Sequence, residues 1–313
     1  MSLRPAYTYG PVPSRRLGRS LGVSVIPPKT CSYSCVYCQL GRTDRLRVKR
    51  KSFFGKEAVL SEIMEQVTVT EMDYITFAGD GEPTLSSDLG WLIRESRKLS
   101  DLPVAVITNG SLLGREDVKT DLVEADIVLP SLDAGSDRVF KAINRPHGTI
   151  TFDAMVRGMI DFRREYTGRI WLEVMLVHGL NDSDEALGDI SHIAEQLKPD
   201  RIYLTTPIRP PAESWVKSPP PQIIIKAQEI IGKAVVINEK ETGDFSLEMF
   251  EQAEEAILEI GSRHPLRMEQ AIQIEEHFHH SGIVDSMISK RRLVKVTHDS
   301  NTYLLPAHFI RSQ

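Results

Sequence analysis

The residues best suited to metal or redox chemistry are three cysteines that share one short segment, 31–38. Cys31, Cys35 and Cys38 are the only cysteines among the 313 residues of the chain. Their C-x3-C-x2-C spacing allows three thiolates to converge on one metal centre. Three cysteines cannot build a disulfide framework, so their crowding favours a thiolate cluster in a reducing cytosol.

Two kinds of metal centre are compatible with this segment. A closed structural zinc site needs four ligands, and the first histidine of the chain, His147, lies far along the sequence. An iron–sulfur cluster held by three thiolates leaves one iron open, and an open iron can bind and activate a ligand. The sequence therefore favours an iron–sulfur cluster, with zinc as the alternative.

Basic residues are concentrated around the cysteines. The whole chain has a formal charge of −5, yet residues 1–56 contain twelve Lys and Arg against one acid, Asp44. This excess predicts an anionic ligand or partner near the cysteines. The alternative is a solvated charged loop without a partner.

Six predicted strands alternate with helices and must position these residues. The strands are expected at 22–26, 73–78, 104–107, 127–129, 170–177 and 201–207. Such alternation implies an α/β fold with parallel pairing through right-handed crossovers, either doubly wound or an incomplete barrel. No Gly-x-Gly-x-x-Gly motif follows a strand. Polar or glycine-rich residues recur just after the strands, where barrel active sites lie, so we favour the barrel.

The composition changes after the sixth strand. Prolines punctuate the next stretch, so a boundary is expected near 210–245. Helices at 247–262, 267–277 and 282–290, then strands at 293–297 and 302–305, follow the order of a winged helix. We therefore predict a barrel at 1–210, a linker and barrel-covering segment at 211–245, and a winged-helix-like domain at 246–313.

The cysteine motif, with the aromatic Tyr37 just before its last cysteine, resembles the signature of radical S-adenosylmethionine (SAM) enzymes. The resemblance covers about residues 7–210 and implies a partial (β/α)6 barrel of the TIM type. It also implies that Cys31, Cys35 and Cys38 hold a [4Fe–4S] cluster whose open iron chelates SAM. In such enzymes, reductive cleavage of SAM releases a 5′-deoxyadenosyl radical that abstracts hydrogen from a substrate.

The resemblance further implies a set of SAM-binding residues. Tyr37 would lie against the adenine. The segment Gly79-Asp80-Gly81-Glu82-Pro83 resembles the Gly-Gly-Glu-Pro motif that receives the methionyl amino group, with Asp80 in place of a glycine. The simpler interpretation of this segment is a turn that ends a strand. The resemblance leaves the catalytic residues unassigned.

Four more positions match places where the family contacts the ribose or the methionine carboxylate of SAM. They are Asn109, Ser131, Asp133 and Glu173. The simpler roles are an Asn-Gly turn for Asn109 and a helix cap for Asp133. Asn181 or Asp182 is expected to cap the helix after the fifth strand. The segment 144–147 also looks familial, without an assigned role.

A narrower resemblance is carried by residues 10–18 and 37–43. These segments are similar to a group of proteins related to wyosine tRNA synthetases. Archaeal enzymes that make the wyosine tricycle use a second cluster held by additional N-terminal cysteines, and this chain has no cysteine left for one. We therefore expect a protein related to that group but not identical with its tRNA-modifying members.

Two substrate classes and one role without catalysis stay open. The favoured hypothesis is that the winged helix docks a protein or peptide that the radical modifies. The alternative is tRNA or another RNA, bound by the basic residues and by 290–292. However, residues 247–313 contain seven basic and ten acidic residues. The role without catalysis is a metal-containing winged-helix regulator.

The basic segment also predicts a redox partner. Reduced ferredoxin or flavodoxin is acidic, so the excess of positive charge would steer either carrier towards the cluster. The sequence has no apolar run long enough to span a membrane and no apolar segment of a secretory signal. We therefore expect a cytoplasmic enzyme of the oxidoreductase or transferase type.

Overall fold

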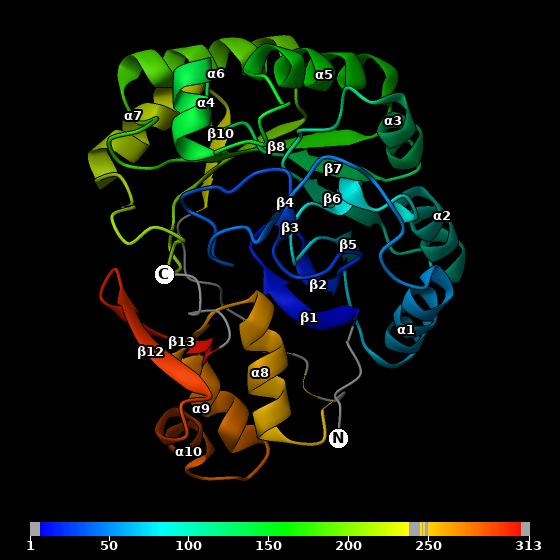
Figure 1. Cartoon of the computed structure of the whole chain (residues 1–313), viewed down its shortest axis with the longest axis vertical. Helices are drawn as coiled ribbons and strands as arrows, with labels where there is room; N and C mark the ends of the chain where they lie inside the picture. The colour runs from blue at the N-terminus through cyan, green and yellow to red at the C-terminus, as the bar shows by residue number, and fades with distance from the viewer. Residues whose placement is uncertain (1–6, 238–244, 246, 248–249, 308–313) are drawn as a thin grey trace.

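An eight-stranded sheet, curled into a half-barrel, forms most of the molecule (Figure 1). The computed structural model describes residues 7–237, 245, 247 and 250–307. The order of the strands is β1-β2-β5-β6-β7-β8-β9-β10. They are β1 (Thr8–Ser14), β2 (Gly18–Val23), β5 (Tyr74–Phe77), β6 (Val104–Thr108), β7 (Ile127–Pro130), β8 (Arg169–Met175), β9 (Arg201–Thr205) and β10 (Ala234–Ile237).

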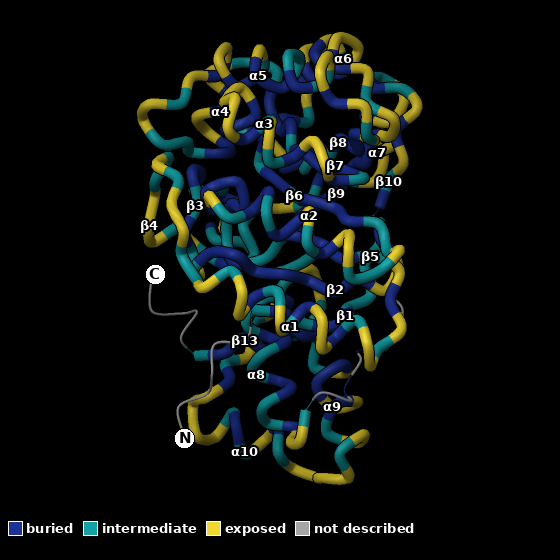
Figure 2. Tube along the Cα trace, turned by 90° about the vertical axis from the view of Figure 1, so that its right-hand side faces the viewer, coloured by how far each residue is buried: buried dark blue, intermediate teal, exposed yellow. Residues whose placement is uncertain are grey.

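Strand pairing confirms the predicted partial barrel. β1 and β2 are antiparallel, whereas every other neighbouring pair of this sheet is parallel. Parallel strands need crossover connections, which the helices supply. Those of the barrel are α1 (Lys56–Val69), α2 (Leu89–Leu99), α3 (Glu116–Leu122), α4 (Asp137–Ile143), α5 (Phe152–Glu165), α6 (Asp184–Leu197) and α7 (Pro221–Ile231). The strands are largely buried, and exposed residues gather on the outer helices (Figure 2).

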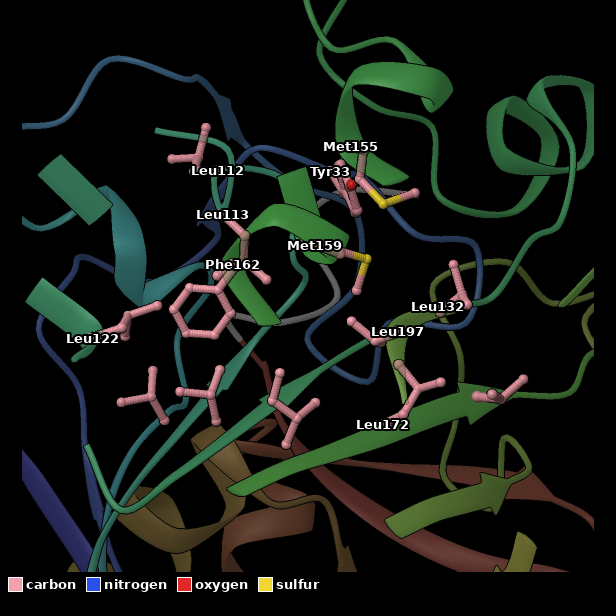
Figure 3. Close-up of a cluster of buried hydrophobic side chains, with 14 of the residues drawn as sticks. Tyr33, Leu112, Leu113, Leu122, Leu132, Met155, Met159, Phe162, Leu172 and Leu197 are labelled. Carbon is pink, nitrogen blue, oxygen red and sulfur yellow. The ribbon is translucent and has the colours of Figure 1, made fainter. Parts of the chain in front are cut away.

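The helices cover the sheet because each presents one apolar face to it. On α5, Met155, Met159 and Phe162 recur every three to four residues and are all buried. They pack with Leu113 and Leu172 in one cluster (Figure 3). Burial of each large apolar side chain contributes about 1.5–3 kcal/mol to the stability of the fold.

The sheet contains two strands beyond the six predicted. β1 precedes the first predicted strand, which itself begins earlier than expected and ends at Val23. β10 follows α7 and pairs with β9, so segment 211–245 adds another helix and strand to the barrel pattern. The prolines that indicated a linker lie before or at the start of α7. The division of the chain into three units stays a prediction.

The turn between β1 and β2 fills the barrel interior at the end opposite the cysteines. Leu17 is buried in a cluster that includes Trp171, Tyr203 and Ile237. Arg15 Nη1 donates a hydrogen bond to the Ile237 carbonyl at 2.8 Å, which joins the two edges of the curled sheet. Any ligand in the barrel must therefore lie between this turn and the cysteine loop.

The C-terminal residues form helices followed by a hairpin, in the predicted order. The elements are α8 (Ala253–Arg263), β11 (Leu266–Arg267), α9 (Met268–His277), α10 (Ile283–Ser289), β12 (Leu293–His298) and β13 (Asn301–Pro306). The strands form an antiparallel sheet in the order β11-β13-β12. The winged-helix-like arrangement has a core of its own, which includes Ile257, Ile274 and Leu304. In the described part of the chain, no helix is long and apolar enough to cross a membrane.

Candidate functional site

The three cysteines lie in a loop that leaves the barrel after β2. The loop contains β3 (Thr30–Cys31), which pairs with β4 (Arg45–Leu46). Its backbone is fixed to the end of α4, because the Val36 amide donates to the Ile143 carbonyl at 2.9 Å. The Cys38 amide donates to the Cys35 carbonyl at 3.1 Å, which tightens the turn between these two cysteines.

Side-chain amides approach two of the sulfurs. Asn109 Nδ2 lies 3.4 Å from Cys31 Sγ, and Asn144 Nδ2 lies 3.5 Å from Cys35 Sγ. Burial, with a smaller contribution from the nearby Glu82 carboxylate, raises the pKa of Cys31 to about 12. A thiolate in such a place needs a positive centre to replace its proton. Three thiols, two of them with a side-chain amide donor at sulfur, fit an iron–sulfur cluster, whose potential such hydrogen bonds tune.

The described residues offer no ready single-ion site of the kind that the zinc alternative needs. Among the described residues, no three His, Cys, Asp or Glu side chains converge on a single-ion position. The thiolates of one zinc ion all lie about 2.3 Å from it, which draws them tightly together. Thiolates of a [4Fe–4S] cluster bind different irons and stay farther apart.

The loop after β5 presses against the start of the cysteine loop. A Cβ atom at Gly81 would lie 1.9 Å from the Thr30 carbonyl oxygen. The Glu82 amide donates to the same oxygen at 3.1 Å, and the Lys29 amide donates to the Asp80 carbonyl at 2.7 Å. Only glycine permits this approach at position 81, so the loop predicted to bind SAM and the loop predicted to bind the cluster form one unit.

Glu82 is buried behind this loop. Its carboxylate accepts hydrogen bonds from the Thr84 amide and hydroxyl, the Thr108 hydroxyl and the Asn109 amide, at 2.6–3.1 Å. Burial raises the pKa of Glu82, and these donors oppose the rise. Glu82 thus fixes Asn109 at the end of β6, where its side chain faces Cys31.

Asp133 is the corresponding anchor on the other side of the cysteine loop. Tyr37 Oη donates to Asp133 Oδ2 at 2.5 Å, and Asn144 Nδ2 donates to the same oxygen at 2.7 Å. The Met175 amide donates to Oδ1 at 2.9 Å. Burial raises the pKa of Asp133, and the Tyr37 hydrogen bond opposes the rise. Asp133 therefore sets the position of the Tyr37 ring.

Two expected helix caps are wrong. Ser136, not Asp133, is the N-cap residue of α4, and Ser183, rather than Asn181 or Asp182, caps α6. Asn181 is buried instead, and its side chain accepts from the Val177 amide at 2.7 Å. The Asp133 carboxylate and the Asn181 carboxamide are thus engaged with the loops after β7 and β8. The helices begin farther along the chain and are capped by serines.

Ser131 and Glu173 face each other across neighbouring strand ends. The two residues form an isolated parallel bridge between the end of β7 and β8. Glu173 also forms an ion pair with Arg16, from the turn between β1 and β2. The carboxylate predicted to contact ribose therefore has a cationic partner that the sequence did not indicate.

These elements surround a cavity of about 310 Å³ inside the barrel. Four predicted site residues line it: Tyr37, Cys38, Gly79 and Glu173. The other predicted residues are not part of this lining. They are Cys31, Cys35, Asp80, Gly81, Glu82, Asn109, Ser131 and Asp133.

The C-terminal region supplies part of the cavity wall. Arg263, at the end of α8, lines the cavity and donates from Nε to Asp80 Oδ2 at 3.3 Å. Its carbonyl accepts from Gln39 Nε2 at 2.9 Å, one residue beyond Cys38. Asp80, which departs from the family pattern, thus anchors α8 to the loop after β5. No local pattern around Arg263 marks it as a site residue, so sequence reasoning missed it.

Tyr9 is a second lining residue that the sequence did not indicate. Its ring packs where a Cβ at Gly22 would lie 2.1 Å from Cζ, and the Arg263 guanidinium lies 5.2 Å from the ring centroid. Burial raises the pKa of Tyr9 to about 12, and Arg263 opposes the rise. The hydroxyl is therefore protonated at neutral pH and lies beside Gly79.

Comparison with known proteins agrees with this geometry. The model of the radical SAM superfamily matches residues 25–189, just over half of the chain and the part that carries the cysteine loop and both anchors. The chain belongs to the radical SAM superfamily. It is also 37% identical over 308 residues to a UPF0026 protein of Methanocaldococcus jannaschii, with 95% of each chain covered, so it belongs to the UPF0026 family.

Solved structures place this radical SAM protein by fold. Streptococcus suis SuiB bound to S-adenosylmethionine has a TM-score of 0.53 at 15% identity, covering 70% of this chain and half of SuiB. TYW1 with a lysine-pyruvate adduct covers 93% of this chain and 80% of that chain, at a TM-score of 0.45 and 14% identity. The likeness to TYW1 is distant.

Membership of the radical SAM superfamily confirms the broad predictions. The chain is a radical SAM enzyme, its cofactors are a [4Fe–4S] cluster and SAM, and it needs a reductant. These findings leave the regulator hypothesis without support.

Proposed function

We propose that this radical SAM enzyme modifies a side chain of a protein or peptide in the barrel cavity. Cys31, Cys35 and Cys38 would hold the [4Fe–4S] cluster, and SAM would bind beside it. When bound, these cofactors supply a 5′-deoxyadenosyl radical that abstracts hydrogen from the substrate. The observation that carries the proposal is the barrel cavity, which has Cys38, Tyr37 and Gly79 in its wall.

The residues around the cavity have distinct proposed roles toward SAM. Tyr37, fixed by Asp133, would pack against the adenine. The backbone of Gly79, Asp80 and Gly81 would receive the methionyl amino group, with Glu82 holding that backbone from behind. We assign the ribose and carboxylate contacts to the residues placed at the ends of β6, β7 and β8, namely Asn109, Ser131, Asp133 and Glu173.

The size of the cavity favours a side chain over a nucleotide. Pockets for drug-sized ligands measure about 300–1,000 Å³, and this cavity of about 310 Å³ lies at the lower end while also holding part of SAM. Leu17 and its neighbours close one end, and Arg263 and His264 cover another part of the wall. A small group that projects from a peptide fits the remaining space better than a base, ribose and phosphate together.

The proposal includes a reducing cytoplasmic setting and an acidic electron donor. All three cysteines are free thiols, as cluster ligands require. Reduced ferredoxin or flavodoxin is the proposed donor, because the basic segment around the cysteines would attract either carrier.

The substrate class can be tested by the rate of 5′-deoxyadenosine formation. The reconstituted protein, with SAM and dithionite, would receive either a peptide fraction or a small-RNA fraction of its host cells. We expect the peptide fraction to raise the rate several-fold above the rate without substrate, because abstraction from a bound substrate pulls the cleavage forward. Protease treatment of that fraction serves as the control and should remove the effect. Stimulation by the RNA fraction alone would contradict the proposal.

A further inference from the structure

A strip rich in basic residues includes β4 and pairs through its backbone with Cys31, a proposed cluster ligand. This basic strip consists of Arg45, Leu46, Arg47, Lys49 and Lys51. Leu46 on β4 is the pairing partner of Cys31 on β3, and the Arg47 amide donates to the Cys31 carbonyl at 2.9 Å. Since paired strands lie about 4.8 Å apart, the outer surface of the strip is one strand away from Cys31.

The strip faces the solvent. Arg45, Lys49 and Lys51 are exposed, and Leu46 keeps 42% of its surface accessible. Figure 2 shows β4 at the edge of the molecule, outside β3. The Arg47 guanidinium and the Lys51 ammonium lie 5.3 and 5.0 Å from the centroid of the Phe53 ring. The strip thus presents the exposed Leu46 side chain among four basic residues.

The charges of the strip are not neutralised. In the described part of the chain, Arg45, Arg47, Lys49 and Lys51 form no ion pair with an acid. Neighbouring basic residues differ in this respect, since Arg42 pairs with Glu213. Like charges held this close repel one another, and a surface of this kind attracts an anionic partner over a long range.

We propose that the basic strip is the docking surface for a small acidic one-electron carrier protein of the ferredoxin or flavodoxin class. The inference rests on the proposed function, because it needs a cluster bound at Cys31. The carrier would lose one electron and the cluster would gain one, with no bond made or broken. Charge complementarity selects the acidic partner, and the Leu46–Cys31 pairing gives the electron a short path.

An RNA substrate fits this surface less well. None of the strip residues lines the barrel cavity. An RNA bound along the strip would therefore be held beside Cys31 and not at the cavity where its nucleotide must react. An electron carrier only has to approach the cluster, and the strip lies close to Cys31.

Charge reversal in the strip tests this inference. The double variant Arg45→Glu and Lys49→Glu removes two exposed cations. Arg157→Glu and Lys198→Glu form the matched control. These residues, on α5 and at the end of α6, are also exposed cations that pair with no acid among the residues the structure describes. Each reconstituted protein would be reduced either with photoreduced bacterial flavodoxin or with dithionite, and the loss of cluster absorbance would be followed at low salt.

We expect the flavodoxin-driven rate of the strip variant to fall on the order of tenfold or more, because electrostatic steering raises association rates by about 10–1,000-fold. The control variant should match the wild type, and dithionite should reduce all three proteins equally. An unchanged flavodoxin-driven rate in the strip variant would overturn the proposal, as would an equal loss with dithionite. Loss of RNA retention with normal flavodoxin reduction would also overturn it, in favour of an RNA surface. A wild-type protein that takes up no cluster would instead refute the proposed function.

Discussion

Replacement of Cys35 with alanine is expected to remove the cluster and all cleavage of SAM. The two remaining thiolates would hold two irons of a cluster that already leaves one iron open, so the cluster would lack the ligands to stay assembled. Asn144 would also lose the sulfur that its amide approaches at 3.5 Å. The measurements are iron and sulfide content per chain and visible absorbance after anaerobic reconstitution. In the variant, all three should fall to the detection limit.

The adjacent Ser34 provides a control for the cysteine variant. Its hydroxyl accepts from the Thr43 amide at 3.2 Å and makes no hydrogen bond with a sulfur among the described residues. Ser34→Ala should therefore keep the iron content of the wild type. Wild-type iron and absorbance in Cys35→Ala would show that Cys35 is not a ligand.

Replacement of Gly81 with alanine is expected to separate the two loops that form the site. The new methyl group would lie 1.9 Å from a backbone oxygen, which cannot rotate away as a flexible side chain can. Overpacking of this kind costs about 3 kcal/mol of unfolding free energy. Because the displaced backbone is the proposed site of the methionyl amino group, we also expect at least tenfold weaker binding of SAM.

Chemical denaturation and equilibrium binding of SAM measure the two effects of Gly81→Ala. Gly148→Ala is the matched control, since no atom lies within 4 Å of its added Cβ. It should change the unfolding free energy by less than about 0.5 kcal/mol, as surface substitutions usually do. If Gly81→Ala resembles Gly148→Ala in both measurements, the close contact with Thr30 has no role in the site.

The central strands and the cysteine loop could be predicted from sequence because their signals are local. Apolar runs such as 104–107 and 127–129 mark buried strands, and three cysteines in one loop mark a thiolate centre. β1 and β10 were missed, since β1 contains glycine and prolines and β10 exposes Val235 at the sheet edge. Continuous apolar runs mark strands that are buried on both faces, and the edge strands β1 and β10 do not show them.

The contacts that complete the cavity could not be predicted from sequence because they join distant residues. Arg263 meets Asp80 across 183 positions, and Arg16 meets Glu173 across the barrel interior. Neither arginine lies in a motif. The only local sign was Asp80 itself, a carboxylate where the family pattern has glycine, and its partner became evident only in the fold.

The most direct test of the central claim is the production of 5′-deoxyadenosine by the wild-type protein. After anaerobic reconstitution, the protein would be mixed with dithionite and SAM, and the nucleosides would be separated and quantified. If Cys31, Cys35 and Cys38 hold a [4Fe–4S] cluster beside a SAM site, 5′-deoxyadenosine and methionine should accumulate together. A fully loaded, reduced cluster that forms no 5′-deoxyadenosine would contradict the account.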